Sequence, residues 1–215
     1  MKTLLDKVFL LNRTTGKFEG AEVYHGIDAN NLAHVEGRWR PMFETRRQEV
    51  ETTGQTMADV NAEDSHWEWS KKAFGAVNNP LLYDVFVMEC GGGTQAIMIT
   101  CKGGESCFSR HDEHKHAPLV YVELLATAPW NRPGLVAEPV YKGAGRVMIG
   151  AAVSLSLEEE FDGRIGLHSL PGAEAFYLNA IHMTDLGVDE EGEHKGLRYL
   201  ELPSSQTKTF LSKPH

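Results

Sequence analysis

The sequence lacks several features that would indicate a familiar class of protein. Its cysteines, Cys90, Cys101 and Cys107, are odd in number and form no CxxC pair, so a reduced, cytoplasmic protein is the simplest prediction. No apolar run approaches the roughly twenty residues that cross a bilayer. Asp6 and Lys7 interrupt the apolar N-terminus where a signal peptide would be continuous. We therefore expect no membrane partner.

Positive charge is also scarce. The chain has 21 Lys and Arg against 30 Asp and Glu, a formal net charge of −9. This balance argues against general nucleic-acid binding, which requires a basic face. It mildly favours cationic or neutral acceptors through long-range attraction. No repeat or low-complexity tract divides the 215 residues, so we expect one domain, residues 1–215.

Hydrophobic periodicity predicts a mixed α/β sheet with helices on its faces. Strands are expected over residues 7–12, 21–25, 82–90, 94–101, 120–127, 164–169 and 196–202. Gly91, Gly92 and Gly93 predict a hairpin between two of them. Helices are expected over residues 30–47, over 61–75 with Asp64 as cap, over 145–161 with Gly163 after its end, and from Pro171 onward.

Two side-chain clusters permit both a structural and a functional interpretation. Trp67 and Trp69 in HWEW are typical of a helix face packed on a sheet, although either could line an acceptor pocket. His111, His114 and His116 have a spacing that could hold a metal ion. Because acids and bases alternate around them, we favour a solvated loop and expect no metal.

The turn Gly143-Ala144-Gly145 opens the longest predicted helix, where unpaired N–H groups attract phosphate. A dinucleotide fingerprint would need a glycine at Met148, and a Walker loop would need its lysine after the glycines, whereas Lys142 precedes them. Taken alone, the turn fits an ordinary helix start equally well. A nucleotide-binding protein stays open as a third interpretation.

Several motifs, in order, resemble the GNAT family of acetyl-CoA-dependent N-acyltransferases. Residues 140–145 (VYKGAG) match both glycines of its Q/R-x-x-G-x-G/A motif and depart at the first position. Residues 127–129 stand in place of V-x-P, and residues 173–177 match A-x-x-[FL]-Y, with Leu170 replacing the usual asparagine. The resemblance covers about residues 82–202. It is closest to uncharacterised bacterial members that share HWxW, ATAPWNR, GRIGLHSLP and LRYxE.

The resemblance implies a GNAT-like mixed, mostly antiparallel central sheet with helices on both faces, and acetyl-CoA as co-substrate. The pyrophosphate would lie on the helix N-terminus, where glycines permit close approach. The pantetheine arm would lie along a strand like an added strand, where the sheet splays beside a bulge. The residues implied in donor binding are Leu124, Leu125, Ala126, Thr127, Lys142, Gly143, Ala144, Gly145 and Arg146.

Three residues are candidates for catalysis. Tyr177 matches the family tyrosine that protonates the leaving sulfur. Glu123, in the middle of an apolar strand, is a candidate base whose pKa burial would raise, or alternatively a salt-bridge partner. His168 is a second candidate base, although a lone strand histidine is more often structural. The N–H of Leu125 could polarise the thioester carbonyl. Because no cysteine is suitably placed for an acyl-enzyme, we expect direct transfer.

These residues predict an N-acetyltransferase that acts on a primary amine of a small molecule, peptide or protein, with the acceptor unidentified. The N-terminal residues would help to form the acceptor side, although residues 1–58 are outside the resemblance. Dimers are common in the family, so a homodimer is an open expectation. The alternative is a non-catalytic GNAT-fold module for acyl-CoA sensing or protein contacts.

Overall fold

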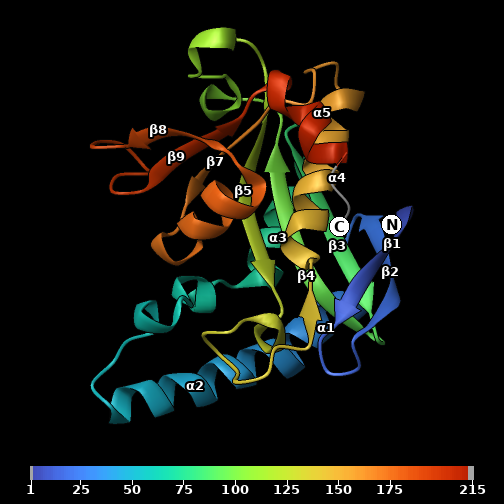
Figure 1. Cartoon of the computed structure of the whole chain (residues 1–215), viewed down its shortest axis with the longest axis vertical. Coiled ribbons are helices and arrows are strands. Elements are labelled where there is room, and N and C mark those ends of the chain that lie inside the picture. Colours follow the sequence, from blue (N-terminus) through green and yellow to red (C-terminus); the bar gives the residue numbers. More distant parts are fainter. Residues whose placement is uncertain (1, 213–215) are drawn as a thin grey trace.

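A nine-stranded sheet organises the computed structural model, which describes residues 2–212 (Figure 1). The strand order is β6-β1-β2-β3-β4-β5-β7-β9-β8, and every neighbouring pair is antiparallel except β5 and β7. The strands are β1 (Thr3–Asn12), β2 (Lys17–His25), β3 (Tyr83–Cys90), β4 (Gly93–Cys101), β5 (Val120–Thr127), β6 (Tyr141–Lys142), β7 (Ile165–Ser169), β8 (Thr184–Val188) and β9 (Arg198–Leu202).

Helices cover both faces of this sheet. They are α1 (Ala29–His34), α2 (Arg40–Thr52), α3 (Trp69–Val77), α4 (Ala144–Glu158) and α5 (Ser204–Ser212), with π-helical segments at Val35–Trp39 and Phe176–Ile181. In Figure 1, α4 lies in front of the sheet and α3 behind it. None of the helices within residues 2–212 has the length and apolar character that a bilayer crossing needs.

Each face has its own hydrophobic core. Met148 and Ile149 of α4 pack on one face, where Met98 of β4 is fully buried. On the other face, Trp39 and Trp69 pack against alternate residues of the same strands. Because successive strand residues point to opposite faces, the apolar runs of β3 and β4 supply both cores. The mixed, mostly antiparallel sheet with helices on both faces is confirmed.

The sheet opens between β5 and β7. These parallel strands pair only at Val120 with Ile165 and at Tyr121 with Gly166. Just beyond, the register of β5 on β4 shifts, and Glu123 is the extra residue of the bulge. A bulge increases the local twist, so the two strands diverge from this point. The predicted splay beside a bulge is present.

The predicted helix over residues 61–75 is wrong in its first half, because α3 begins only at Trp69. Asn61 has the left-handed conformation, with φ of 54°, which interrupts a helix. Asp64 does not act as a helix cap; its carboxylate pairs with Arg132, which is distant in sequence. Tertiary contacts therefore override the local helix signal.

Smaller differences concern segment ends. Helix α4 ends at Glu158, and Gly163, with φ of 75°, belongs to a later turn rather than to the helix end. Pro171 begins only a 3-10 turn, Pro171–Ala173, and Tyr177 lies on the π-helical segment that follows. Strands β6 and β8 and helix α5 were not predicted. The hairpin at Gly91 and Gly92 is confirmed, with both residues at positive φ.

Candidate functional site

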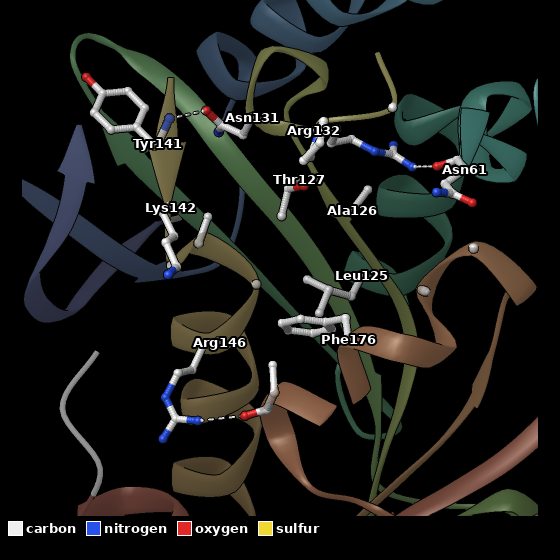
Figure 2. Close-up of a pocket in the computed structure, with 18 of the residues that line it drawn as sticks. Asn61, Leu125, Ala126, Thr127, Asn131, Arg132, Tyr141, Lys142, Arg146 and Phe176 are labelled. Carbon is white, nitrogen blue, oxygen red and sulfur yellow. Dashed lines mark hydrogen bonds between the residues drawn. The ribbon is translucent and has the colours of Figure 1, made fainter. Parts of the chain in front are cut away.

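The opening between β5 and β7 leads into a cavity of about 720 Å³ (Figure 2). Its wall consists of the end of β5, the start of α4, the segment that holds Tyr177, the loop after β5, residues 60–64, and the β1–β2 hairpin. Lining residues from these elements include Leu125, Ala126, Thr127, Gly143, Ala144, Gly145, Phe176, Asn61, Arg132, Phe9 and Phe18.

The N-terminus of α4 faces this cavity with free donors. Gly143 has φ of 108° and no side chain caps the helix. The N–H of Val147 bonds back to the Gly143 carbonyl at 3.0 Å, so the N–H groups of Ala144 and Gly145, which precede it, point out of the helix end. A Cβ on Gly145 would lie 3.0 Å from the Phe176 ring. These donors suit a phosphate.

A buried glutamine holds the loop that leads into α4. Gln95 accepts hydrogen bonds from Trp130 Nε1 and Asn131 Nδ2, both at 2.9 Å. Asn131 in turn accepts from the Tyr141 N–H at 2.9 Å, as Figure 2 shows. Tyr141 lies in β6, which pairs with β1 and leads directly to Gly143. The loop after β5 therefore positions the helix start.

Basic side chains are concentrated at this end of the cavity. Lys142 and Arg13 are exposed and line the cavity. Arg146 is held against the C-terminal helix: its Nη2 donates to the Phe210 carbonyl at 2.7 Å, and its guanidinium lies 4.3 Å from the Phe210 ring. The cationic side chains that a phosphate would contact most easily are therefore Lys142 and Arg13.

Tyr177 lies deeper in the cavity. It is only 7% exposed, and its hydroxyl makes no hydrogen bond to any residue from 2 to 212. Burial, and secondarily the negative charge of Asp64, raise the pKa of the phenol above its usual value. The hydroxyl therefore keeps its proton at neutral pH and can donate it to a bound group.

Residues 60–64, which we call the strap, bridge the two diverging strands. On the β5 side, Arg132 donates from Nη1 to Asp64 Oδ2 at 2.9 Å and from Nη2 to the Asn61 carbonyl. On the β7 side, the Gly172 N–H donates to Glu63 Oε1 at 2.8 Å. A Cβ on Gly172 would come within 2.7 Å of Asn61. The close fit explains glycine at this position and holds the strap across the opening.

Glu123 lies at the bulge, but it is not among the residues that line the cavity. Partial desolvation by the surrounding protein raises the pKa of its carboxyl, while the charge of His194 lowers that pKa. Because solvent reaches the side chain, we expect the increase to be small. Because Glu123 lies beside the opening, it remains one of the candidate bases.

His168 belongs to a buried hydrogen-bonded chain on the sheet face opposite α4. Its side chain is 2% exposed, and both ring nitrogens have partners: Tyr121 Oη at 2.7 Å from Nδ1 and Asp189 Oδ2 at 2.9 Å from Nε2. Arg110 binds the other oxygen of Asp189 at 2.6 Å. Burial lowers the pKa of His168, so Nε2 donates to Asp189 and Nδ1 accepts from Tyr121. Like Glu123, His168 does not line the cavity.

The two clusters noted in the sequence lie outside the cavity. Trp69 is 3% exposed in the core behind the sheet, and Trp67 packs against it. His111 and His114 lie in the loop before β5, where His114 Nε2 is 2.7 Å from Ser204 Oγ. Within residues 2–212, no group of three or more His, Cys, Asp or Glu side chains is arranged to hold a metal ion.

Comparison with known proteins shows which solved structures share this architecture. No protein-family model and no curated protein matches the sequence. FeeM, an N-acyl amino acid synthase from uncultured soil microbes, aligns over 88% of this chain and 93% of its own, with a TM-score of 0.53 and 12% identity. An uncharacterised protein of Bacillus halodurans aligns over 97% and 95%, with a TM-score of 0.52 and 10% identity. A GNAT-family acetyltransferase of Streptococcus agalactiae aligns over 86% and 96%, with a TM-score of 0.48 and 15% identity.

The chain has the fold of FeeM and of the Bacillus halodurans protein. This result agrees with the family resemblance of the sequence motifs. At identities of 12% and 10% the likeness to these two proteins establishes the fold alone, so the chemistry has to be argued from this chain's own side chains.

Most of the residues expected in donor binding line one cavity: Leu125, Ala126, Thr127, Lys142, Gly143, Ala144, Gly145 and Arg146. Leu124 does not; it packs toward the core behind the sheet. Tyr177 joins the lining residues, whereas Glu123 and His168 lie outside them. The sequence reasoning missed Arg13, Asn61, Glu63, Asp64 and Arg132, which line the cavity from distant segments. The acidic pair at Glu63 and Asp64 is the one signal visible in the sequence, and its local pattern predicts a helix start at Asp64.

Proposed function

We propose that this chain transfers an acetyl group from acetyl-CoA directly to a primary amine. One observation carries the proposal. The hydroxyl of Tyr177, which has no hydrogen-bond partner within residues 2–212, lies in the same cavity as the N-terminus of α4 and the edge of β5 beyond its pairing with β7. The description of FeeM as an N-acyl amino acid synthase is in keeping with acyl transfer to an amine on this fold.

The donor would occupy the cavity along β5. Beyond Tyr121, β5 has no strand partner on the β7 side, so its backbone groups there can bond the amides of pantetheine. The pyrophosphate would meet the N–H groups of Ala144 and Gly145, with Lys142 and Arg13 close by. In this arrangement the thioester would lie near Tyr177.

The reaction requires a neutral amine, a stabilised oxyanion and a proton for the leaving sulfur. The amine nitrogen attacks the carbonyl carbon, a C–N bond forms, and the C–S bond breaks. Tyr177 gives its hydroxyl proton to the thiolate. The Leu125 N–H stabilises the carbonyl oxygen. Glu123 accepts the proton of the amine through water; we prefer it to His168, both of whose ring nitrogens are hydrogen-bonded.

Release of free thiol from acetyl-CoA tests this function. We expect purified protein to bind coenzyme A by calorimetry and to release thiol only when a primary amine is added. If ATP raises the melting temperature and coenzyme A does not, the cavity binds a nucleotide and the proposal fails.

A second function, acyl-CoA sensing without catalysis, is favoured by one observation. Neither Glu123 nor His168, the two candidate bases, lines the cavity. Under this function, coenzyme A binds tightly, but no amine in a broad panel stimulates thiol release. The same assay therefore separates the two functions.

A further inference from the structure

The two ends of the cavity differ in charge. The end at α4 has basic side chains, Lys142 and Arg13. The end beneath the strap has two carboxylates, Glu63 and Asp64, and one guanidinium, Arg132. A donor with several phosphates fits the basic end, which leaves the acidic end for the acceptor.

The carboxylates at the acidic end keep acceptor capacity for a ligand. Asp64 is 6% exposed, and its Oδ1 lies 2.8 Å from Arg132 Nη2 but accepts no hydrogen bond from residues 2–212. Glu63 uses Oε1 for the Gly172 N–H, and no residue in that range donates to its Oε2. A carboxylate oxygen can accept more than one hydrogen bond, so Glu63 Oε2 and Asp64 Oδ1, which already contacts Arg132, can each accept from a ligand N–H group.

The side chains at the strap end of the cavity have a net negative charge. Asp64 and Arg132 form a two-contact ion pair that is neutral overall, which leaves the charge of Glu63 uncompensated. The amine that attacks the thioester must be neutral at that moment, so it cannot balance a permanent carboxylate. A second, non-reacting ammonium group on the acceptor can.

We propose that the acceptor is a small diamine, with one amine beside the thioester and the other, as an ammonium ion, held by Glu63 Oε2 and Asp64 Oδ1. Asp64 and Tyr177 line the same cavity, so an acceptor bound at the strap can reach the thioester there. The strap spans the opening, which limits the size of the group beneath it. This inference rests on the proposed acetyl transfer.

Three amines of equal chain length test the proposal: 1,4-diaminobutane, butylamine and 4-aminobutyrate, whose far ends are a cation, a methyl group and an anion. With acetyl-CoA in excess, we expect kcat/KM for thiol release to be about tenfold or more higher for diaminobutane than for butylamine, and lowest for aminobutyrate. This tenfold difference in kcat/KM is the effect expected from one hydrogen bond to a charged group.

Glu63→Gln is the decisive variant, because its amide oxygen can still accept from Gly172 and keep the strap in place. We expect KM for diaminobutane to rise about tenfold and the preference over butylamine to disappear, with KM for acetyl-CoA unchanged. Glu138→Gln is the control, since Glu138 is exposed outside the cavity and the charge change is the same.

Two results would overturn the inference while leaving the donor site intact: aminobutyrate used as well as diaminobutane, or a Glu63→Gln protein that keeps the diamine preference. Calorimetric titration of diaminobutane into the coenzyme A complex gives a second measurement that does not need turnover. If coenzyme A binds and diaminobutane does not, the diamine proposal fails alone. If coenzyme A itself does not bind, the proposed function fails as well.

Discussion

The two ends of the cavity are built in different ways. The proposed donor end uses backbone groups: two N–H groups at the start of α4, and the edge of β5 beyond Tyr121, where no strand within residues 2–212 pairs on the β7 side. The proposed acceptor end uses side chains from two segments distant in sequence, with Glu63 and Asp64 on the strap and Arg132 on the loop after β5. Backbone recognition suits a part shared by all coenzyme A esters, whereas side chains can differ with the acceptor.

The largest effect is expected from Tyr177→Phe, which removes the proposed proton donor between the two ends. We expect kcat for thiol release to fall by about 10² to 10⁴-fold, the usual contribution of a general acid. The affinity for coenzyme A by calorimetry should stay within about twofold, because the ring is kept. An unchanged kcat would exclude Tyr177 as the acid.

At the acceptor end, Asp64→Asn leaves the guanidinium of Arg132 without its charged partner. The pair is mostly buried, so we expect the free energy of unfolding to fall by about 2 kcal/mol or more. Denaturant titration measures this loss. The double variant Asp64→Asn/Arg132→Met should lose less than Asp64→Asn alone, since no unpaired charge remains.

At the donor end, Gly145→Ala brings a methyl group within 3.0 Å of the Phe176 ring, at the point where a phosphate would approach. We expect KM for acetyl-CoA to rise several-fold, to about tenfold, with KM for the amine unaffected. Gly150→Ala is the matched control, because it lies on the same helix with open space around it. That change should leave KM unchanged and slightly stabilise the protein.

The smallest expected effect is the pH dependence of the free energy of unfolding that His168 causes. This residue lies outside both ends of the cavity. Burial lowers its pKa in the folded protein, so on acidification the unfolded chain takes up a proton first. We expect the free energy of unfolding to fall as pH decreases from about 6.5, the unfolded value, toward the lower folded pKa. In His168→Gln this part of the pH dependence should be absent when unfolding is measured at several pH values. An unchanged pH dependence would show that other groups cause it.

The same comparison shows which parts of the site the sequence could predict. The strand with Leu125 and the turn at Gly143 are local patterns, and the donor end was implied by the resemblance of their ordered motifs to a known family. The strap could not be predicted, because Asp64 pairs with a residue 68 positions away and its local pattern favours a helix. The bulge at Glu123 depends on the register of β5 against β4. No local pattern specifies that register.

A crystal structure of the protein with coenzyme A tests the central claim most directly. We expect the pyrophosphate against the N–H groups of Ala144 and Gly145, pantetheine along β5 beyond Tyr121, and the sulfur within hydrogen-bonding distance, roughly 3.5 Å, of the Tyr177 hydroxyl. Coenzyme A bound outside the cavity, or with its sulfur directed away from Tyr177, would contradict the account.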